Sequence, residues 1–179
     1  MKLHLNKIKS RISLFVCKIF YGKAFSCTGV PIQVRFSSFQ MTKGGSVRLG
    51  RMVNIEENTV LKVRKGAILE LGDDVYFNRN CIVVCRGCVV IGSHCRFGPN
   101  VCIYDHDHSY DGKGVNDEFR VGKIQIGEKC WIGANSVILR DSRIGDGCIV
   151  GAGVIIKGDI PAHSLVFQDK AGFVIREIH

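Results

Sequence analysis

The chain has 179 residues and a formal net charge of +9, and it is 46% hydrophobic with only three prolines. This composition excludes an intrinsically disordered chain and is sufficient for one domain with a hydrophobic core. The positive charge is confined to one region, because residues 1–55 hold ten Lys or Arg and no Asp or Glu. Such an uneven distribution favours an anionic lipid or an anionic acceptor as partner, and it argues against nucleic acid.

The N-terminal segment, residues 1–44, is predicted to form a basic amphipathic helix and a capping segment. Its apolar residues fall near one helical face: Leu5, Ile8, Ile12, Phe15, Val16 and Ile19. The helix is too short and too charged to span a bilayer. Two roles remain open for residues 1–25: covering the open end of a β-helix, and contacting a membrane surface.

A six-residue hydrophobic period follows, which fits neither an α-helix nor a simple strand. It is clearest in one run: Ile126, Ile132, Ile138, Ile144, Val150 and Ile156. Short repeats of this kind are typical of parallel β-helices, in which three six-residue faces make one turn. We therefore expect an all-β coil of about five turns over residues 45–160, with register slips before residue 91, followed by a C-terminal segment over 161–179.

Nine cysteines raise the question of disulfides or a metal site. Four of them share one slot, four residues after a hexad Ile or Phe: Cys81, Cys95, Cys130 and Cys148. Because this slot takes small residues, we interpret them as buried free thiols of a protein in the reducing cytoplasm. No secretory signal is evident, and no bound metal is expected, since Cys81, Cys85 and Cys88 occupy different slots of the repeat.

Residues 104–123 interrupt the period with a polar segment, predicted to be a loop that leaves the coil and carries function. It contains two histidines, and His acts as a general base near neutral pH. A neighbouring carboxylate can orient the ring; the candidates are Asp105, Asp107, Asp111 and Glu118. Beyond the loop, Trp131 precedes a hexad Ile and should point outward, where it could face a substrate or sugar ring.

Three segments resemble the hexapeptide-repeat acetyltransferases, most of all the galactoside, maltose and surface-polysaccharide O-acetyltransferases: residues 126–135, 144–154 and 157–161. The resemblance covers residues 45–178. It implies a left-handed parallel β-helix that assembles as a homotrimer. It also implies active sites between subunits, with the co-substrate acetyl-CoA along the groove between neighbouring coils.

The resemblance also implies roles for single residues. The family's catalytic His lies five residues after the last hexad residue before the loop, which gives His108, with His106 as the alternative. Glu118 is similar to an acidic residue near that His, and Asn80 to an acceptor contact; Asp105 and Asp107 are further candidates for substrate binding. The implied acetyl-CoA contacts are Trp131 at the acetyl group, Ala134, Gly151 and Ala152 along the pantetheine arm, and Lys157 and Arg176 at the phosphates.

We therefore expect a cytoplasmic O-acetyltransferase that transfers acetyl from acetyl-CoA to a hydroxyl of a cell-surface polysaccharide sugar, of capsule or lipopolysaccharide, near the inner membrane face. One alternative changes the acceptor to an amine, on an amino sugar or a xenobiotic. A second is a zinc enzyme of the γ-carbonic anhydrase type, which needs three His ligands and could draw only on His94, His106 and His108. A third is a non-catalytic β-helix that serves as an assembly subunit.

Overall fold

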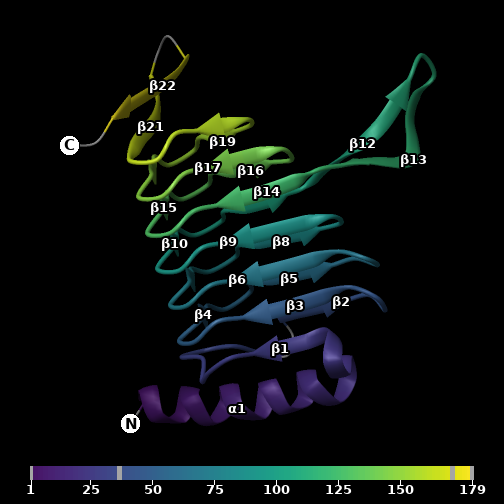
Figure 1. Ribbon diagram of the computed structural model, residues 1–179, viewed down its shortest axis with the longest axis vertical. Helices are drawn as coiled ribbons and strands as arrows, with labels where there is room; N and C mark the ends of the chain where they lie inside the picture. The colour runs from purple at the N-terminus through teal and green to yellow at the C-terminus, as the bar shows by residue number, and fades with distance from the viewer. Residues whose placement is uncertain (1, 36–37, 170–171, 178–179) are drawn as a thin grey trace.

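The computed structural model is a three-sided column of stacked β-strands with one helix across its lower end and one hairpin projecting from its side (Figure 1). The column makes about six turns and is a left-handed parallel β-helix. The structure describes the backbone of residues 2–35, 38–169 and 172–177, and the side chains of residues 8–35 and 38–168.

Each side of the column is one sheet, and we call the three sheets A, B and C. Within a sheet, each strand pairs with the strands of the turns above and below it. Helix α1 spans Lys2–Tyr21 and a short 3-10 turn spans Gly22–Ala24. Sheet A consists of β1 (Phe25–Cys27), β3 (Ser46–Leu49), β6 (Ile68–Leu71), β9 (Cys88–Ile91), β14 (Lys123–Ile126), β17 (Ser142–Ile144) and β20 (Asp159–Ile160). Sheet B consists of β4 (Asn54–Ile55), β7 (Tyr76–Phe77), β10 (Arg96–Phe97), β15 (Trp131–Ile132), β18 (Ile149–Val150), β21 (Ser164–Asp169) and β22 (Gly172–Glu177). Sheet C consists of β2 (Phe39–Met41), β5 (Val60–Val63), β8 (Ile82–Cys85), β11 (Cys102–Tyr104), β16 (Val137–Leu139) and β19 (Ile155–Ile156).

The interior of the column is lined by the hexad residues, one from each side per turn. All six members of the clean run from Ile126 to Ile156 are buried, at 1% exposure or less. Phe77 and Phe97 stack on adjacent turns, with ring centroids 4.3 Å apart. The four cysteines of the shared slot are also buried and free. The six-residue period and the small-residue slot predicted from the sequence are therefore confirmed.

The corners of the column explain two residue types in the repeat. At the corner from sheet B to sheet C, an asparagine takes a left-handed conformation in four successive turns, with φ near +60°: Asn58, Asn80, Asn100 and Asn135. Asn tolerates this conformation better than most residues. The glycine after the hexad Ile has another reason: a Cβ on Gly92 would lie 2.6 Å from the backbone of Gly127 in the next turn.

The irregularities of the repeat gather at a different corner, from sheet C to sheet A. The first slip falls at residues 64–67, where Gly66 turns with φ +76°, and the second at residues 86–87. The polar segment 104–123 leaves the column at this corner too. It forms an antiparallel hairpin of β12 (His106–Asp111) and β13 (Gly114–Val121). The predicted protruding loop is therefore an ordered two-stranded ribbon.

The column extends beyond the predicted limits of 45 and 160 at both ends. Strands β1 and β2 already pair in parallel with the next turn, although their segments lack a readable hexad. This adds a turn to the five expected. At the other end β21 continues sheet B in parallel, and β22 then turns back antiparallel to it. One end is thus covered by helix α1, and at the other end β22 extends sheet B along one side of the column.

Candidate active site

The root of the hairpin is fixed by Asp105, which is fully buried. Its carboxylate accepts hydrogen bonds from the backbone N–H groups of Arg86 and Gly87 at 2.8 Å each. It also lies 3.2 Å from Nδ1 of His106. Because these partners enclose both oxygens, Asp105 anchors the hairpin to the turn below. The structure thus gives it this anchoring role rather than the predicted contact with substrate.

The two candidate bases share one face of the hairpin. His106 is mostly buried, and its ring meets Tyr104 and Phe119 edge-on. His108 is exposed, with its ring centroid 4.5 Å from that of Phe119. Burial raises the pKa of Tyr104 to about 12, so its phenol stays protonated at neutral pH. The face therefore presents one histidine held by a carboxylate and one open to solvent.

Phe119 is held in place by a cation. The guanidinium carbon of Arg86 lies 3.4 Å from the ring centroid, within the range of a cation–π contact. Burial and the nearby positive charge of Arg64 lower the pKa of Arg86. Its Nε is buried without a hydrogen-bond partner in the described structure. Sequence reasoning missed Arg86 and Phe119; the register slip at residues 86–87 was the available signal, because it marks the corner on which the hairpin rests.

The opposite face of the hairpin root carries an ion-pair cluster. Oδ2 of Asp107 accepts a 2.5 Å hydrogen bond from Nε of Arg140 and lies 3.9 Å from Nζ of Lys157. This bond raises the pKa of Arg140, which is also paired with Asp141. The cluster ties the hairpin to the two turns above it. Sequence reasoning missed Arg140 and assigned Asp107 to the substrate, whereas here Asp107 contacts cations of its own chain.

Glu118 lies next to Phe119 on β13 and is exposed. Successive residues of a strand point to opposite faces, and Phe119 is the direct cross-strand partner of His108. Glu118 therefore points to the face opposite the two histidines. One protomer does not bring the predicted acidic residue and the predicted base together.

The predicted contacts to the acetyl group and the pantetheine arm of acetyl-CoA lie on the other side of the column. Trp131 is 55% exposed on sheet B, the side opposite the corner that carries the hairpin. Its predicted outward orientation is confirmed. Three small residues follow at the corner from sheet B to sheet C, in the last two turns: Ala134, Gly151 and Ala152. The two turns approach each other closely at this corner, since a Cβ on Gly133 would lie 2.5 Å from the backbone nitrogen of Ala152. Figure 1 shows this separation, with the hairpin projecting away from β15.

The two cations predicted at the phosphates are not neighbours. Lys157 follows sheet C and lies beside Asp107 at the hairpin root. The backbone of Arg176 pairs with Leu165 at the end of sheet B; its side chain lies outside the described residues. Asn80 is exposed at the left-handed corner before sheet C, among the stacked asparagines.

A cavity of about 730 Å³ lies behind the hairpin root, against sheet A. Its lining includes Cys88, Val121, Lys123, Gln125 and Arg143. None of the predicted site residues lines it, but Val121, the cross-strand partner of His106, does, so the cavity borders the root of the histidine face. Among the described residues, no group of three or more His, Cys, Asp or Glu is placed to hold a metal ion.

Comparison with known proteins shows what kind of repeat this is. The family model described as bacterial transferase hexapeptide (six repeats) matches residues 123–158, from β14 to just past β19. These residues are therefore similar to the hexapeptide repeats of bacterial transferases. The match covers the clean run of hexads that follows the hairpin.

Among curated proteins, the chain is similar to acetyltransferases. A galactoside O-acetyltransferase of Lactococcus lactis is 33% identical over 104 residues, which are 57% of this chain and 50% of that protein. The chain spans about half to two thirds of the length of the curated relatives it matches.

Two solved structures share the fold at low identity. A hexapeptide-repeat acetyltransferase of Vibrio cholerae complexed with acetyl coenzyme A has a TM-score of 0.60 at 18% identity, covering 99% of this chain and 90% of its own. The N-acyltransferase AntD of Bacillus cereus, in complex with a dTDP-amino sugar and coenzyme A, has a TM-score of 0.64 at 16% identity, covering 86% and 81%.

Proposed function

We propose that this hexapeptide protein is an acetyl-CoA-dependent O-acetyltransferase whose active site forms between two copies of the chain. One observation carries the proposal: the histidine face of the hairpin and the Trp131 corner lie on different sides of one column. Each is half of a site. An acceptor held by one copy can meet acetyl-CoA held by the next only if the copies associate.

The outer surface of sheet C supports a trimer. In an ordinary solvent-facing sheet the outward residues are polar, yet one outward ladder here is apolar over five turns: Val60, Ile82, Cys102, Val137 and Ile155. Ile155 is 58% exposed. The corner between sheets B and C, which follows Trp131 on β15, is called the Trp131 corner. It forms one edge of sheet C, and the corner with the hairpin forms the other. If sheet C faces a threefold axis, the hairpin corner of one copy therefore meets the Trp131 corner of the next. Cyclic closure completes three equal sites.

We propose that His108 is the general base. It is exposed, so a hydroxyl can reach it, and it occupies the position that the family resemblance indicates. It removes the proton of the acceptor hydroxyl as the oxygen attacks the thioester carbonyl, and the proton then passes to the departing thiolate sulfur of CoA. The N–H groups of Trp131, Gly133 and Asn135 donate to carbonyl oxygens of neighbouring turns, so the N–H of Ala134 in the adjacent copy is the proposed donor to the oxyanion. His106, already bonded to buried Asp105, supports the fold of the hairpin and is the alternative base.

The bound acetyl-CoA fits the small residues on the corner of the last two turns. Ala152 and Gly153 are exposed, and their backbone is not covered by larger side chains. The thioester supplies the activated acetyl group, and Trp131 forms an apolar wall beside it. Lys157 and Arg176 remain the proposed phosphate contacts, contributed from different sides of the column. Asn80 remains a proposed acceptor contact.

We propose as acceptor a sugar hydroxyl of a surface polysaccharide, acetylated in the cytoplasm at the inner face of the membrane. The basic, acid-free residues 1–55 support this location, because anionic lipids and lipid-linked glycans carry the opposite charge. The shared fold of AntD keeps an amino group as the second candidate acceptor. Screening sugars and amino sugars for acetyl-CoA-dependent CoA release separates the two.

Substitution of each histidine tests the assignment of the base. His108→Ala should lower kcat by roughly 10²–10⁴-fold, the usual contribution of a general base, while acetyl-CoA binding measured by calorimetry stays unchanged. His106→Gln, which keeps a donor toward Asp105, should lower kcat much less. A His108→Ala variant with near wild-type kcat, or the reverse order of the two variants, would reject His108 as the base.

A further inference from the structure

Helix α1 docks on the column through one stripe of its surface. The stripe recurs at helical spacing and is partly or fully buried: Ser10, Leu14, Cys17 and Tyr21. Ser10 Oγ accepts a 3.0 Å hydrogen bond from the backbone N–H of Val34, and the Tyr21 hydroxyl donates to the carbonyl oxygen of Phe39 at 3.0 Å. The helix lies across the end of the column, but the stripe that docks there is not the apolar face read from the sequence.

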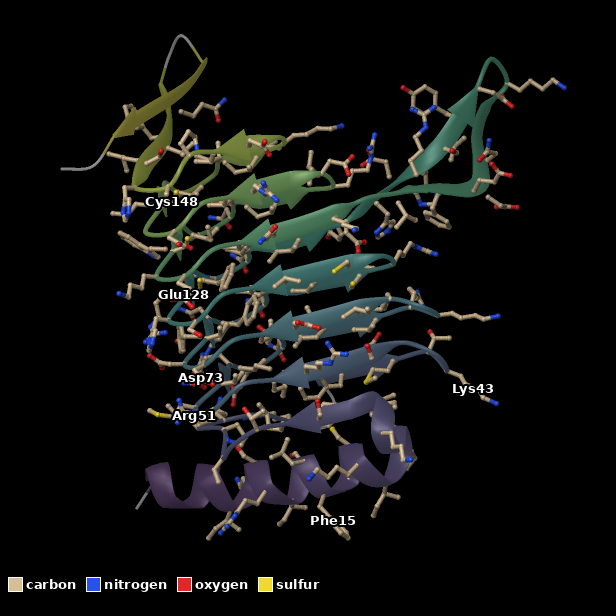
Figure 2. The ribbon with its side chains drawn as sticks, in the orientation of Figure 1. Phe15, Lys43, Arg51, Asp73, Glu128 and Cys148 are labelled. Atoms are coloured by element: carbon tan, nitrogen blue, oxygen red, sulfur yellow. The ribbon has the colours of Figure 1, made fainter. Side chains whose placement is uncertain are left out.

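The apolar face of the helix points away from the column. Its members have the same spacing, turned by about half a circle from the docked stripe: Ile8 (47% exposed), Ile12 (59%), Phe15 (65%) and Ile19 (64%). We call these four residues the outward stripe. In Figure 2, Phe15 points down from α1, on the side opposite the sheets. A helix that is only a cap has no reason to be apolar on this side.

Basic side chains border the outward stripe. Arg11 and Lys18 lie along one side of it and Lys9 along the other, and all three are exposed. Within the described part of the chain none of the three has an acidic partner in an ion pair. The sequence of residues 1–55 contains no Asp or Glu.

We propose that the outward stripe is an interfacial membrane-binding surface for anionic phospholipid, which binds while the opposite stripe stays docked on the column. Apolar residues between two rows of cations fit the boundary between acyl chains and anionic headgroups. A second copy of the same helix is a poorer occupant, because it would bring like charges together. No helix in the described part of the chain is both long and apolar enough to span a bilayer.

This inference deepens the proposed location at the membrane and rests on it, and it specifies an orientation. Helix α1 crosses the end of the column (Figure 1), so a helix lying in the membrane surface holds the column upright on the bilayer. In the proposed trimer the three columns are parallel, and three outward stripes face the same plane. Weak contacts would then add up, because each further helix binds at a high effective concentration.

Co-sedimentation of the full chain with vesicles tests the proposal. The vesicles are phosphatidylcholine alone or phosphatidylcholine with about one third phosphatidylglycerol. The wild-type chain should bind the anionic vesicles and lose most of that binding at high salt. Ile12→Ser with Phe15→Ser should lower binding by more than about tenfold, and so should Arg11→Gln with Lys18→Gln.

Matched controls lie away from the helix. Met52→Ser removes an apolar side chain of similar exposure, and Lys113→Gln removes a cation at the hairpin tip; both should bind like the wild type. Acetyl-CoA binding by calorimetry should be unchanged in all variants, so loss of lipid binding alone leaves the enzymatic proposal intact. Equal binding to both vesicle types, unchanged binding of the stripe variants, or a change in oligomeric state caused by Phe15→Ser would overturn the membrane-binding surface.

Discussion

At the scale of single residues, the cysteines of the shared slot act as hydrogen-bond donors as well as core atoms. Each thiol points at a carbonyl oxygen at the same corner of the next turn. Cys81 reaches Gly98 at 3.1 Å and Cys95 reaches Gly127 at 3.0 Å. Ser136 occupies the same slot and donates to Gly151 at 2.9 Å. The slot therefore requires a small side chain, because valine also fills it, buried, at Val75, Val101 and Val154. A thiol or hydroxyl placed there adds a hydrogen bond to the next turn, so the number of cysteines is explained by packing and not by disulfides.

Buried and accessible thiols should differ sharply in alkylation. Burial raises the pKa of Cys81 to about 11, so at pH 8 almost none of it is the reactive thiolate, and the fraction grows only as the pH approaches that value. Cys88 is half-buried and lines the cavity behind the hairpin. Iodoacetamide at pH 8, followed by peptide mass spectrometry, should label Cys88 in the native protein and label Cys81 only after denaturation.

The asparagine corner makes a second residue-scale prediction. Asn58 is exposed at φ +60°, a conformation that costs an ordinary L-residue about 1 kcal/mol or more. Asn58→Ala should therefore lower the free energy of unfolding by about that amount, whereas Asn58→Gly should be close to neutral. Urea unfolding of the two variants measures the difference. Equal stability of both would show that the corner does not demand the left-handed conformation.

At the scale of elements, the sequence predicted the coil and the interruption but not the ribbon. The hexad residues are periodic because each must fill the interior, so the coil was readable. The hairpin has no interior to fill, and its order comes from contacts distant in sequence, above all from Asp105 to the backbone of residues 86–87. The polar composition of residues 104–123 therefore resembled a loop. Arg140 was unreadable for the same reason, since its partner Asp107 lies 33 residues earlier.

The Arg140–Asp107 pair should set the angle of the hairpin. Arg140→Met removes both the charge and the hydrogen bond, and should lower kcat by about tenfold through misplacement of His108. It should also speed amide hydrogen exchange in β12 and β13, because the hairpin root loses one of its two attachments. Arg143→Met, on the outer face of β17, is the control. Unchanged kcat and exchange in Arg140→Met would mean that the other contacts of the hairpin root, such as those of Asp105, hold the hairpin without Arg140.

At the scale of the whole molecule, the two surfaces proposed to bind the membrane and the acceptor lie at different heights along the column. The helix lies at one end, and the hairpin leaves just before the fifth strand of sheet A. With strands about 4.8 Å apart, the histidine face stands about 20 Å above the helix. A column upright on a membrane would therefore meet hydroxyls of an extended glycan more readily than those next to the lipid. The proposed division of the site between two copies could not be predicted from the sequence. The hexad spacing predicts which side of the coil each residue occupies, but not which sides of two copies face each other in an assembly.

The division of the site between copies makes the last prediction. His108→Ala spoils the hairpin half of a site and leaves the Trp131 half intact, whereas Trp131→Ala does the reverse. Each variant alone should have little activity. When the two are unfolded together in equal amounts and refolded, random association gives about one quarter of the sites an intact hairpin beside an intact corner. CoA release should therefore recover to about one quarter of the wild-type rate, while the two proteins refolded separately and then mixed stay inactive. If activity does not recover although mass spectrometry shows mixed trimers, both halves of each site belong to one copy, and the intersubunit arrangement is rejected.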